Sequence, residues 1–350
     1  MKKLVTEHCK TYPKLEIQDI FKFLHQSCFG CGHMVSSYED AAIRIKREYE
    51  NTDGVTAFIE PLDGKYSRVS LGWINSGLNP ETLAKLFYLS SKKEPDGLYA
   101  LEEKLKQTHQ LIKDGVLPFS ETEFEKELAL WKSTGYAATH HSDSFNKAYL
   151  PSYRVISDQY TPFVPLLAKL DGMLSKGKVK LCIEGSSASG KTTISELLEK
   201  LYDCTVFHMD DFFLQPYQRT PERFAQPGGN VDRERFLEEV LLPMSRNETV
   251  YYRCFDCSSF KILPPVAVTP KKLVVTEGSY CMHPELASYY DISVFMDISP
   301  KLQRERILER NPDMADRFFD EWIPLEKRYF EHFRIKENCD IIIAIAQEQV

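Results

Sequence analysis

The stretch Val179-Lys-Leu-Cys-Ile-Glu-Gly-Ser-Ser-Ala-Ser-Gly-Lys-Thr-Thr193 dictates how the second half of the chain is expected to fold. An apolar run over residues 179–183 leads into the turn Gly185-x-x-x-x-Gly190-Lys-Thr, and apolar residues at helical spacing follow it. Glycines allow the backbone to curl until successive N–H groups point inward, and the N-terminus of the following helix adds partial positive charge. The pattern therefore predicts a strand, a phosphate-binding loop and a helix that together bind a nucleoside triphosphate.

The side chains of this loop have separate expected roles. Lys191 is expected to reach the β- and γ-phosphates, and the hydroxyl of Thr192 is expected to bind Mg²⁺. ATP and Mg²⁺ are therefore the predicted cofactors. The predicted nucleotide-binding residues are Gly185, Ser186, Ser187, Ala188, Ser189, Gly190, Lys191, Thr192 and Thr193.

Composition excludes several classes of protein. The 350 residues are 43% apolar and 27% charged, which is typical of a globular protein, and the length favours two domains. The net charge of −7 argues against a nucleic-acid partner, because nucleic-acid phosphates would be repelled. No apolar run approaches the ~18 residues of a membrane span, and no apolar signal core follows Met1-Lys-Lys. We therefore expect a cytoplasmic protein without a membrane partner, and the sequence leaves its oligomeric state open, a homo-oligomer included.

The chain has nine cysteines, an odd number, which favours a reducing compartment and free thiols. Two C-x-x-C pairs occur, Cys28/Cys31 and Cys254/Cys257. Together they have the composition of a zinc site, but they lie in opposite halves of the chain, whereas structural zinc sites use closer pairs. Free thiols are the favoured interpretation.

Residues 1–160 are expected to form a separate α+β domain of unknown role. Helical patterns alternate with two short strand-like runs, 55–60 and 66–71, and Asp63-Gly64 between them is a hairpin signal. Six polar residues beside turns could form a second site, although surface or capping roles are favoured. These residues are His33, Glu60, Arg68, His140, His141 and Asp143.

Residues 161–350 are expected to form a doubly wound α/β domain, with the boundary between the two domains near residue 160. Continuous apolar runs suit strands buried on both faces of a parallel sheet, and amphipathic stretches lie between them. The phosphate-binding loop then lies at the carboxyl end of the first strand. The predicted strands are 179–183, 205–208, 273–276, 292–296 and 341–345.

Acidic residues follow two of these strands. Asp210 and Asp211 come directly after the second strand, where a carboxylate can accept the proton of a hydroxyl that attacks a γ-phosphoryl group. Glu277 ends the third strand and is expected to hold Mg²⁺ through water. The alternative is that these are exposed loop acids without a catalytic role.

An arginine-rich helical stretch, 301–310, follows the fourth strand. Arg306 and Arg310 share one face at i, i+4 spacing and are expected to close over the phosphates. The alternative is a solvated helix in which Glu305 and Glu309 pair with the arginines.

Residues 178–346 resemble the uridine kinase/phosphoribulokinase group of P-loop kinases. The resemblance is carried by Gly185-Ser-Ser-Ala-Ser-Gly-Lys-Thr-Thr193, Met209-Asp-Asp-Phe-Phe213, Gly229-Asn-Val-Asp232, Glu277-Gly278 and Met296-Asp297 before the arginine-rich stretch. It implies that Asp210 is the catalytic carboxylate, that Asp232 holds acceptor hydroxyls, and that Glu277 lies on the magnesium side. Asp211 replaces a residue that is often serine in that family.

The sequence departs from this family where uridine kinases read the pyrimidine with an aromatic residue and a histidine. The corresponding stretch, 252–260, offers Phe255 and Asp256 as loose matches and contains no histidine. Losing base-reading groups changes substrate choice, so an acceptor other than uridine is expected. An insert over residues 214–223 adds Arg219 and Arg223, which either favour an anionic acceptor or lie in a solvated loop.

The sequence thus predicts an ATP-dependent kinase that phosphorylates a hydroxyl of a small molecule such as a nucleoside. A nucleotide-dependent sensor is the main alternative, although a sensor needs no acceptor base. A bifunctional enzyme with a second activity in residues 1–160 is another. The predicted catalytic residues are Asp210, Lys191, Arg306 and Arg310, the substrate-binding residues are Asp211, Asp232 and Phe255, and the metal-binding residues are Thr192 and Glu277.

Overall fold

The computed structural model describes residues 1–32, 35–50, 54–63, 65–91 and 97–345. The chain divides into two compact units, the first spanning residues 1–172 and the second beginning at Met173. This division lies within helix α9 (Val164–Leu174), some way beyond the boundary expected near residue 160. Most of α9 belongs to the first unit, where Asp171 near the end of the helix accepts hydrogen bonds from the Asn79 N–H at 2.7 Å and the Thr82 hydroxyl at 3.1 Å.

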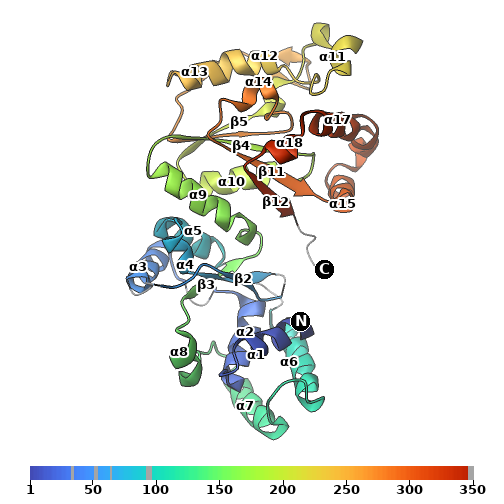
Figure 1. The fold of residues 1–350 in the computed structure, drawn as a ribbon. Coiled ribbons are helices and arrows are strands. Elements are labelled where there is room, and N and C mark those ends of the chain that lie inside the picture. Colours follow the sequence, from blue (N-terminus) through green and yellow to red (C-terminus); the bar gives the residue numbers. More distant parts are fainter. Residues whose placement is uncertain (33–34, 51–53, 64, 92–96, 346–350) are drawn as a thin grey trace. The chain divides into compact units, whose positions relative to one another are not determined.

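The first unit combines helices with a small antiparallel sheet (Figure 1). Strand β2 (Tyr66–Ser70) is central and pairs with β1 (Ile59–Pro61) on one edge and β3 (Tyr153–Ser157) on the other. The separate α+β domain predicted from the sequence is therefore confirmed. Gly64 of the predicted hairpin signal lies outside the described residues. The helices are α1 (Lys2–Thr11), α2 (Ile17–Phe29), α3 (Tyr38–Tyr49), α4 (Gly72–Asn75), α5 (Pro80–Leu89), α6 (Gly97–Lys113), α7 (Glu121–Ser133), α8 (Asp143–Tyr149), η1 (Thr161–Phe163) and α9.

The second unit is built on a five-stranded parallel sheet in the order β12-β11-β4-β10-β5. The predicted doubly wound α/β fold is confirmed. Figure 1 shows α10 (Lys191–Leu201) on one side of this sheet and α12 (Arg233–Phe236) to α14 (Pro284–Ala287) on the other. The strands are β4 (Val179–Gly185), β5 (Cys204–His208), β10 (Leu273–Glu277), β11 (Ile292–Ile298) and β12 (Ile341–Ile345).

Strand β4 lies in the middle of the sheet and is buried along nearly its whole length. Its side chains alternate between the two faces, and Cys182 joins an apolar cluster with Phe207, Phe236 and Tyr329 on one of them. A strand covered on both faces needs an apolar sequence, which explains the continuous run before the phosphate-binding loop.

Two long excursions interrupt the strand–helix alternation. Residues 209–272, between β5 and β10, contain η2 (Met209–Phe212), η3 (Pro216–Gln218), α11 (Pro221–Ala225), α12, a π-helical turn (Leu237–Leu241), α13 (Leu242–Ser245) and the short strands β6 (Val250–Tyr252), β7 (Phe255–Asp256), β8 (Lys261–Ile262) and β9 (Val266–Val268). Residues 299–340, between β11 and β12, contain α15 (Pro300–Arg310), η5 (Pro312–Met314), α16 (Ala315–Arg317), a π-helical turn (Phe318–Trp322), α17 (Ile323–Phe333) and α18 (Ile335–Asn338).

Within the described part of the chain, no helix combines the length and apolar character that crossing a membrane requires.

Candidate functional site

The predicted phosphate-binding loop leaves the carboxyl end of β4 and enters α10. Gly185 has φ +150°, and a Cβ atom there would lie 2.7 Å from the Met296 carbonyl oxygen. Gly190 has φ +92° and is the N-cap of α10. Both positions require glycine, because other residues would meet backbone atoms or adopt a strained conformation. The loop therefore wraps tightly around the N-terminus of α10, as the sequence predicted.

Lys191 is folded back onto this loop. Its Nζ atom donates to the carbonyl oxygens of Gly185 at 2.8 Å and Ser186 at 3.0 Å, and lies 3.4 Å from the Ser279 hydroxyl. The ammonium group is thus held against the backbone of the loop, and a phosphate bound there would need such a counter-charge.

A carboxylate also lies in the loop. Glu326 of α17 accepts the backbone N–H of Ser187 with both oxygens, at 3.1 and 3.0 Å, and the Ser187 hydroxyl at 2.6 Å. Ser279 donates a further hydrogen bond to Glu326 Oε1 at 2.9 Å. Sequence reasoning missed Glu326 because it lies in an ordinary amphipathic stretch far from the loop along the chain.

Glu277 ends β10 beside the start of α10. Its Oε1 atom lies 3.4 Å from the Thr192 hydroxyl, so the structure brings the two predicted metal-binding residues together. The same oxygen lies 2.7 Å from Nδ1 of His208, the last residue of β5, which pairs directly with Glu277 in the sheet. This hydrogen bond is the main cause that raises the pKa of His208 above its ordinary value. His208 is the last residue of the predicted second strand, but nothing in the sequence around it indicated a hydrogen bond with Glu277.

Asp210 and Asp211 follow β5 in the short helix η2. The side chain of Asp210 has exposed surface, but desolvation of its carboxylate by neighbouring residues raises its pKa; Lys191 opposes this rise and Glu277 adds to it. Asp210 is therefore close enough to the loop lysine and to Glu277 to be affected by their charges. The backbone oxygen of Asp211 accepts from Arg235 Nη2 at 3.1 Å.

Asp232 and Phe255, predicted to bind substrate, are both buried. Asp232 is the N-cap of α12 and accepts the Arg235 backbone N–H at 3.3 Å, while Arg235 Nε donates to its other oxygen at 3.2 Å. Phe255 lies in β7 under the guanidinium of Arg219, 5.6 Å from the ring centroid. The structure thus gives both residues packing or capping contacts, and their substrate-binding roles stay predictions.

The second arginine of the insert is structural. Arg223 pairs with Glu234 and donates to the backbone oxygens of Gly229 and Val231, each at 2.8 Å. It therefore fixes the segment before α12 and does not lie free in a solvated loop.

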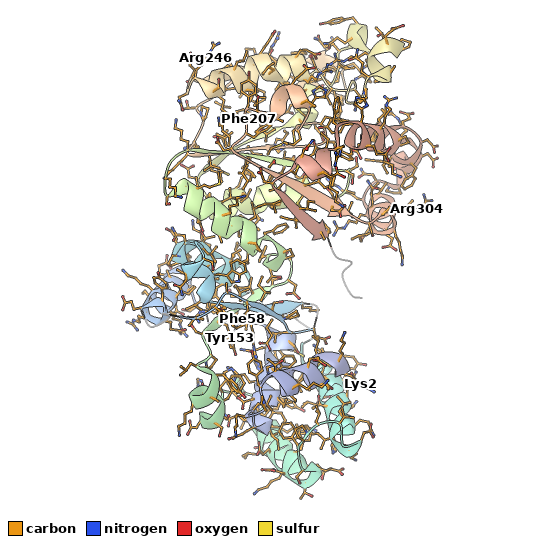
Figure 2. The ribbon with its side chains drawn as sticks, viewed as in Figure 1. Lys2, Phe58, Tyr153, Phe207, Arg246 and Arg304 are labelled. Carbon is orange, nitrogen blue, oxygen red and sulfur yellow. The ribbon has the colours of Figure 1, made fainter. Side chains whose placement is uncertain are left out.

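Helix α15 contacts the phosphate-binding loop through residues three apart. Arg306 Nη1 donates to the Ala188 carbonyl oxygen at 3.3 Å, and Gln303 Nε2 donates to that of Ser187 at 2.9 Å. Arg310 is exposed in the last turn of the helix. Arg304, labelled in Figure 2, lies over the ring of Phe319 at 4.3 Å. The structure therefore places Arg306 at the loop, whereas the role of Arg310 has no geometric support.

The first unit contains a buried polar network around Arg68, which is 1% exposed. Its guanidinium donates to Glu60 at 3.1 Å and, from two nitrogens, to Gln26 Oε1 at 3.0 and 2.8 Å. His8 Nδ1 lies 2.8 Å from the other oxygen of Glu60. Each charge is paired, as buried charges must be, so the contacts favour a structural role for Arg68 and Glu60.

His141 extends this network. Its Nδ1 lies 2.8 Å from Asp19 Oδ1 and its Nε2 lies 2.6 Å from the hydroxyl of Tyr153, which Figure 2 labels on β3. Burial lowers the pKa of His141 to about 4, although the hydrogen bond with Asp19 acts to raise it. The other second-site candidates do not join the network: His140 and Asp143 are exposed, and His33 lies outside the described residues.

The cysteine pairs are divided between the two units. In the described part of the chain, neither pair belongs to a group of three or more potential metal ligands. All nine cysteines are free thiols. One group with ligand-like spacing is present on the helices α6 and α7, consisting of His109, Glu121 and Glu125.

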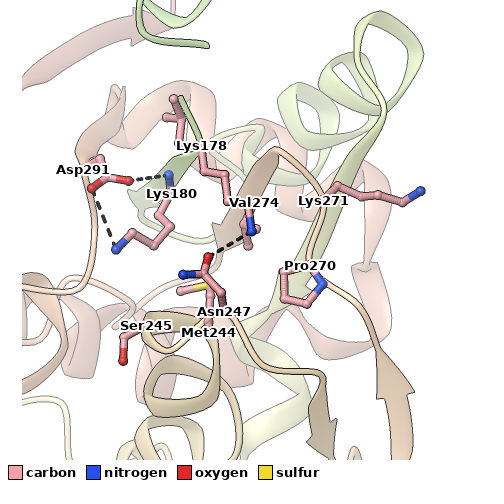
Figure 3. A pocket seen from close by; sticks show the side chains of 10 residues that line it. Lys178, Lys180, Met244, Ser245, Asn247, Pro270, Lys271, Val274 and Asp291 are labelled. Atoms are coloured by element: carbon pink, nitrogen blue, oxygen red, sulfur yellow. Dashed lines mark hydrogen bonds and ion pairs between the residues drawn. The ribbon is translucent and has the colours of Figure 1, made fainter. Parts of the chain in front are cut away.

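A pocket lies at the opposite end of the sheet, where β4 and β10 begin (Figure 3). Its basic side chains have partners: Lys178 donates to Asn247 at 2.9 Å, Lys180 lies 3.8 Å from Asp291, and Lys271 lies 3.2 Å from Asp203. Ligands of open α/β sheets bind at the carboxyl ends of strands, so this pocket is separate from the site at the loop.

Comparison with known proteins identifies the second unit. Residues 181–322 match the model of the Phosphoribulokinase / Uridine kinase family. The tRNA-specific adenosine deaminase subunit tad2 of Schizosaccharomyces pombe is 27% identical over 175 residues, which cover 46% of this chain and 42% of that protein. The chain thus spans less than half the length of this curated relative.

Solved structures show partial likeness. A possible uridine kinase from Bacillus stearothermophilus is 18% identical, with 51% of this chain and 98% of that chain covered and a TM-score of 0.36. Shikimate kinase from Aquifex aeolicus is 20% identical, and the match covers 47% of this chain and 85% of that chain with a TM-score of 0.26. The family match leaves residues 1–180 unassigned. By that match, residues 181–322 carry the signature of the Phosphoribulokinase / Uridine kinase family, which supports a nucleotide-binding phosphotransferase domain in the second unit.

Proposed function

We propose that the second unit is an ATP-dependent kinase that transfers the γ-phosphoryl group to a hydroxyl of a small molecule, such as a nucleoside or a related metabolite. One observation carries the proposal: a lysine-bearing phosphate loop, a Thr–Glu pair and a solvent-open aspartate meet at the carboxyl edge of one parallel sheet. Phosphoryl transfer depends mainly on positioning and charge stabilisation, and these groups supply both.

The oxygen donors present suit a magnesium ion. Mg²⁺ prefers carboxylate and hydroxyl oxygens, and Glu277 and Thr192 offer one of each, 3.4 Å apart. When bound, the ion would neutralise charge on the β- and γ-phosphates. Within the chain itself, Lys191 and the loop N–H groups would hold the phosphates, and Arg306 would cover them from α15.

Asp210 would hold the acceptor hydroxyl and take its proton. A general base works best with a pKa nearer the operating pH than an ordinary aspartate has, and the pKa of Asp210 is raised. Asp211, Asp232 and Phe255 are the proposed contacts to the rest of the acceptor. The absence of a histidine among residues 252–260 supports an acceptor other than uridine.

The test is the variant Asp210→Asn. We expect turnover to fall by about 10²- to 10⁴-fold while the affinity for Mg·ATP stays close to wild type, because the amide can position a hydroxyl but cannot accept its proton. Turnover is measured as acceptor-dependent ADP release, with the acceptor found by mass spectrometry in a library of nucleosides, sugars and vitamins. Asp203→Asn, a change at an exposed aspartate before the opposite end of β5, is the matched control.

Two results would count against the proposal. Wild-type turnover in Asp210→Asn would remove this residue from the reaction. If ATP binds but no library member releases ADP, a nucleotide-dependent sensor becomes the better explanation.

A further inference from the structure

The carboxylate of Glu326 occupies donors that a P-loop uses for phosphate. Its two oxygens accept the backbone N–H of Ser187, and Oε1 also accepts the hydroxyls of Ser187 and Ser279. Four hydrogen bonds of 2.6–3.1 Å thus converge on one planar anion within the loop. The loop recognises anions through such inward-pointing N–H groups, and a carboxylate satisfies them as a phosphate oxygen would.

This contact is not that of a mobile surface side chain. Glu326 is 3% exposed and is one of the three buried residues of α17, with Ile323 and Tyr329, at intervals of three along the helix. By contrast, Glu331 on the same helix is exposed. The buried stripe of α17 therefore directs Glu326 into the loop.

The site also surrounds Glu326 with groups expected to handle the nucleotide. Ser279 Oγ, which donates to Glu326, lies 3.4 Å from Lys191 Nζ. Glu326 further contributes to raising the pKa of Asp210, so its charge is felt at the proposed catalytic base. A triphosphate in the same loop would face this negative charge at short range, and two anions cannot share one set of donors.

We propose that Glu326 is an autoinhibitory plug that mimics a phosphate, so that nucleotide binding requires the Glu326 side chain to leave the loop. The inference rests on the proposed function, because it regulates that same site. A ligand that binds only the open state has an apparent Kd equal to its intrinsic Kd divided by the open fraction. The plug therefore lowers nucleotide affinity in proportion to how fully it closes the loop, and any event that withdraws Glu326 activates the enzyme.

The experiment is calorimetric titration of the full chain with the magnesium complex of a non-hydrolysable ATP analogue. Glu326→Gln removes the charge and one acceptor, and we expect its Kd to fall about tenfold or more, as a closed fraction of about 90% or more predicts. Glu326→Asp keeps the charge but is one methylene too short to reach the loop, and we expect it to bind as tightly as Glu326→Gln. Glu331→Gln makes the same charge change at an exposed position of α17 and should bind as the wild type does.

The outcomes separate this inference from the proposed function. If neither the wild type nor any variant binds the analogue, the proposed function fails. If the wild type binds, Lys191→Ala loses binding, and both Glu326 variants bind as the wild type does or more weakly, the plug alone is overturned. Circular dichroism and thermal unfolding identify any variant that misfolds. If Glu326→Gln misfolds, Glu326→Asp still tests the plug, because it removes only one methylene group.

Discussion

The pH dependence of the first unit's stability follows from one buried histidine. Asp19, whose pKa is held at about 2 because its hydrogen bonds outweigh burial, can only accept, so Nδ1 of His141 carries the proton and Nε2 accepts from the Tyr153 hydroxyl. Protonating Nε2 would place a second N–H against that hydroxyl and a buried charge near Arg68 and Lys22. Neutral His141 is therefore the form that the fold accommodates.

The magnitude follows from the pKa difference between the two states. The pKa of His141 is 6.5 in the unfolded chain and about 4 in the folded one, so the unfolded state binds more protons between these values. The free energy of unfolding must then fall as the pH falls from 6.5 to 4, by about 3 kcal/mol at about 1.4 kcal/mol per pKa unit. Asp19 affects stability at lower pH. Because its pKa is depressed in the folded state, its contribution to the free energy of unfolding is fully present above pH 3.8 and is lost as the pH falls toward 2.

The assay is urea unfolding followed by tryptophan fluorescence. In a Trp322→Phe background the remaining tryptophans, Trp73 and Trp131, both lie in the first unit. The variant His141→Asn keeps a donor toward Asp19 but cannot titrate. Its unfolding free energy should decline about 3 kcal/mol less than that of the parent between pH 7 and pH 4, while His140→Asn, a change at the exposed neighbour, should follow the parent. Parallel pH curves for His141→Asn and the parent would refute this reasoning.

Two further predictions concern the second unit. Glu277→Gln should raise the Mg²⁺ concentration needed for half-maximal ADP release by about 10- to 100-fold, since it removes a carboxylate expected to hold the ion through water; an unchanged Mg²⁺ requirement would place the ion elsewhere. Gly185→Ala should lower the unfolding free energy, followed by Trp322 fluorescence, by about 1–3 kcal/mol, because its Cβ would lie 2.7 Å from a carbonyl oxygen at φ +150°. Gly177→Ala, whose Cβ would meet nothing within 4 Å, is the control and should change stability little.

The phosphate-binding loop was predictable because its determinants are local. Gly185 and Gly190 are required by the positive φ angles of the loop itself, and the N-terminus of α10 follows directly. The strands of the second unit were predictable for a related reason, since burial on both faces demands continuous apolar runs. Asp210 and Glu277 were then placed at the same edge simply because parallel strands end on the same side.

The remaining site contacts depend on three-dimensional register, which spacing along the chain does not encode. His208 meets Glu277 only because β10 lies between β4 and β5, so that Glu277 and His208 become neighbours across the sheet. The arginine-rich helix shows the same limit. The i, i+4 rule selected Arg306 with Arg310, but the face of α15 against the loop contains Gln303 and Arg306, and the helix ends at Arg310.

A second buried carboxylate determines how the proposed plug can open. Glu184, fully buried before the loop, accepts the N–H groups of Tyr280 at 3.1 Å and Met282 at 3.0 Å and the hydroxyl of Tyr329 at 3.1 Å. Burial raises the pKa of Glu184 to about 7 despite these donors, so the carboxylate depends on every partner it has. Tyr329 lies three residues after Glu326 on α17, and a displacement of the helix would take this hydroxyl away from a buried acid. Rotation of the Glu326 side chain about its own bonds keeps Tyr329 in place, and it is therefore the opening motion that costs least.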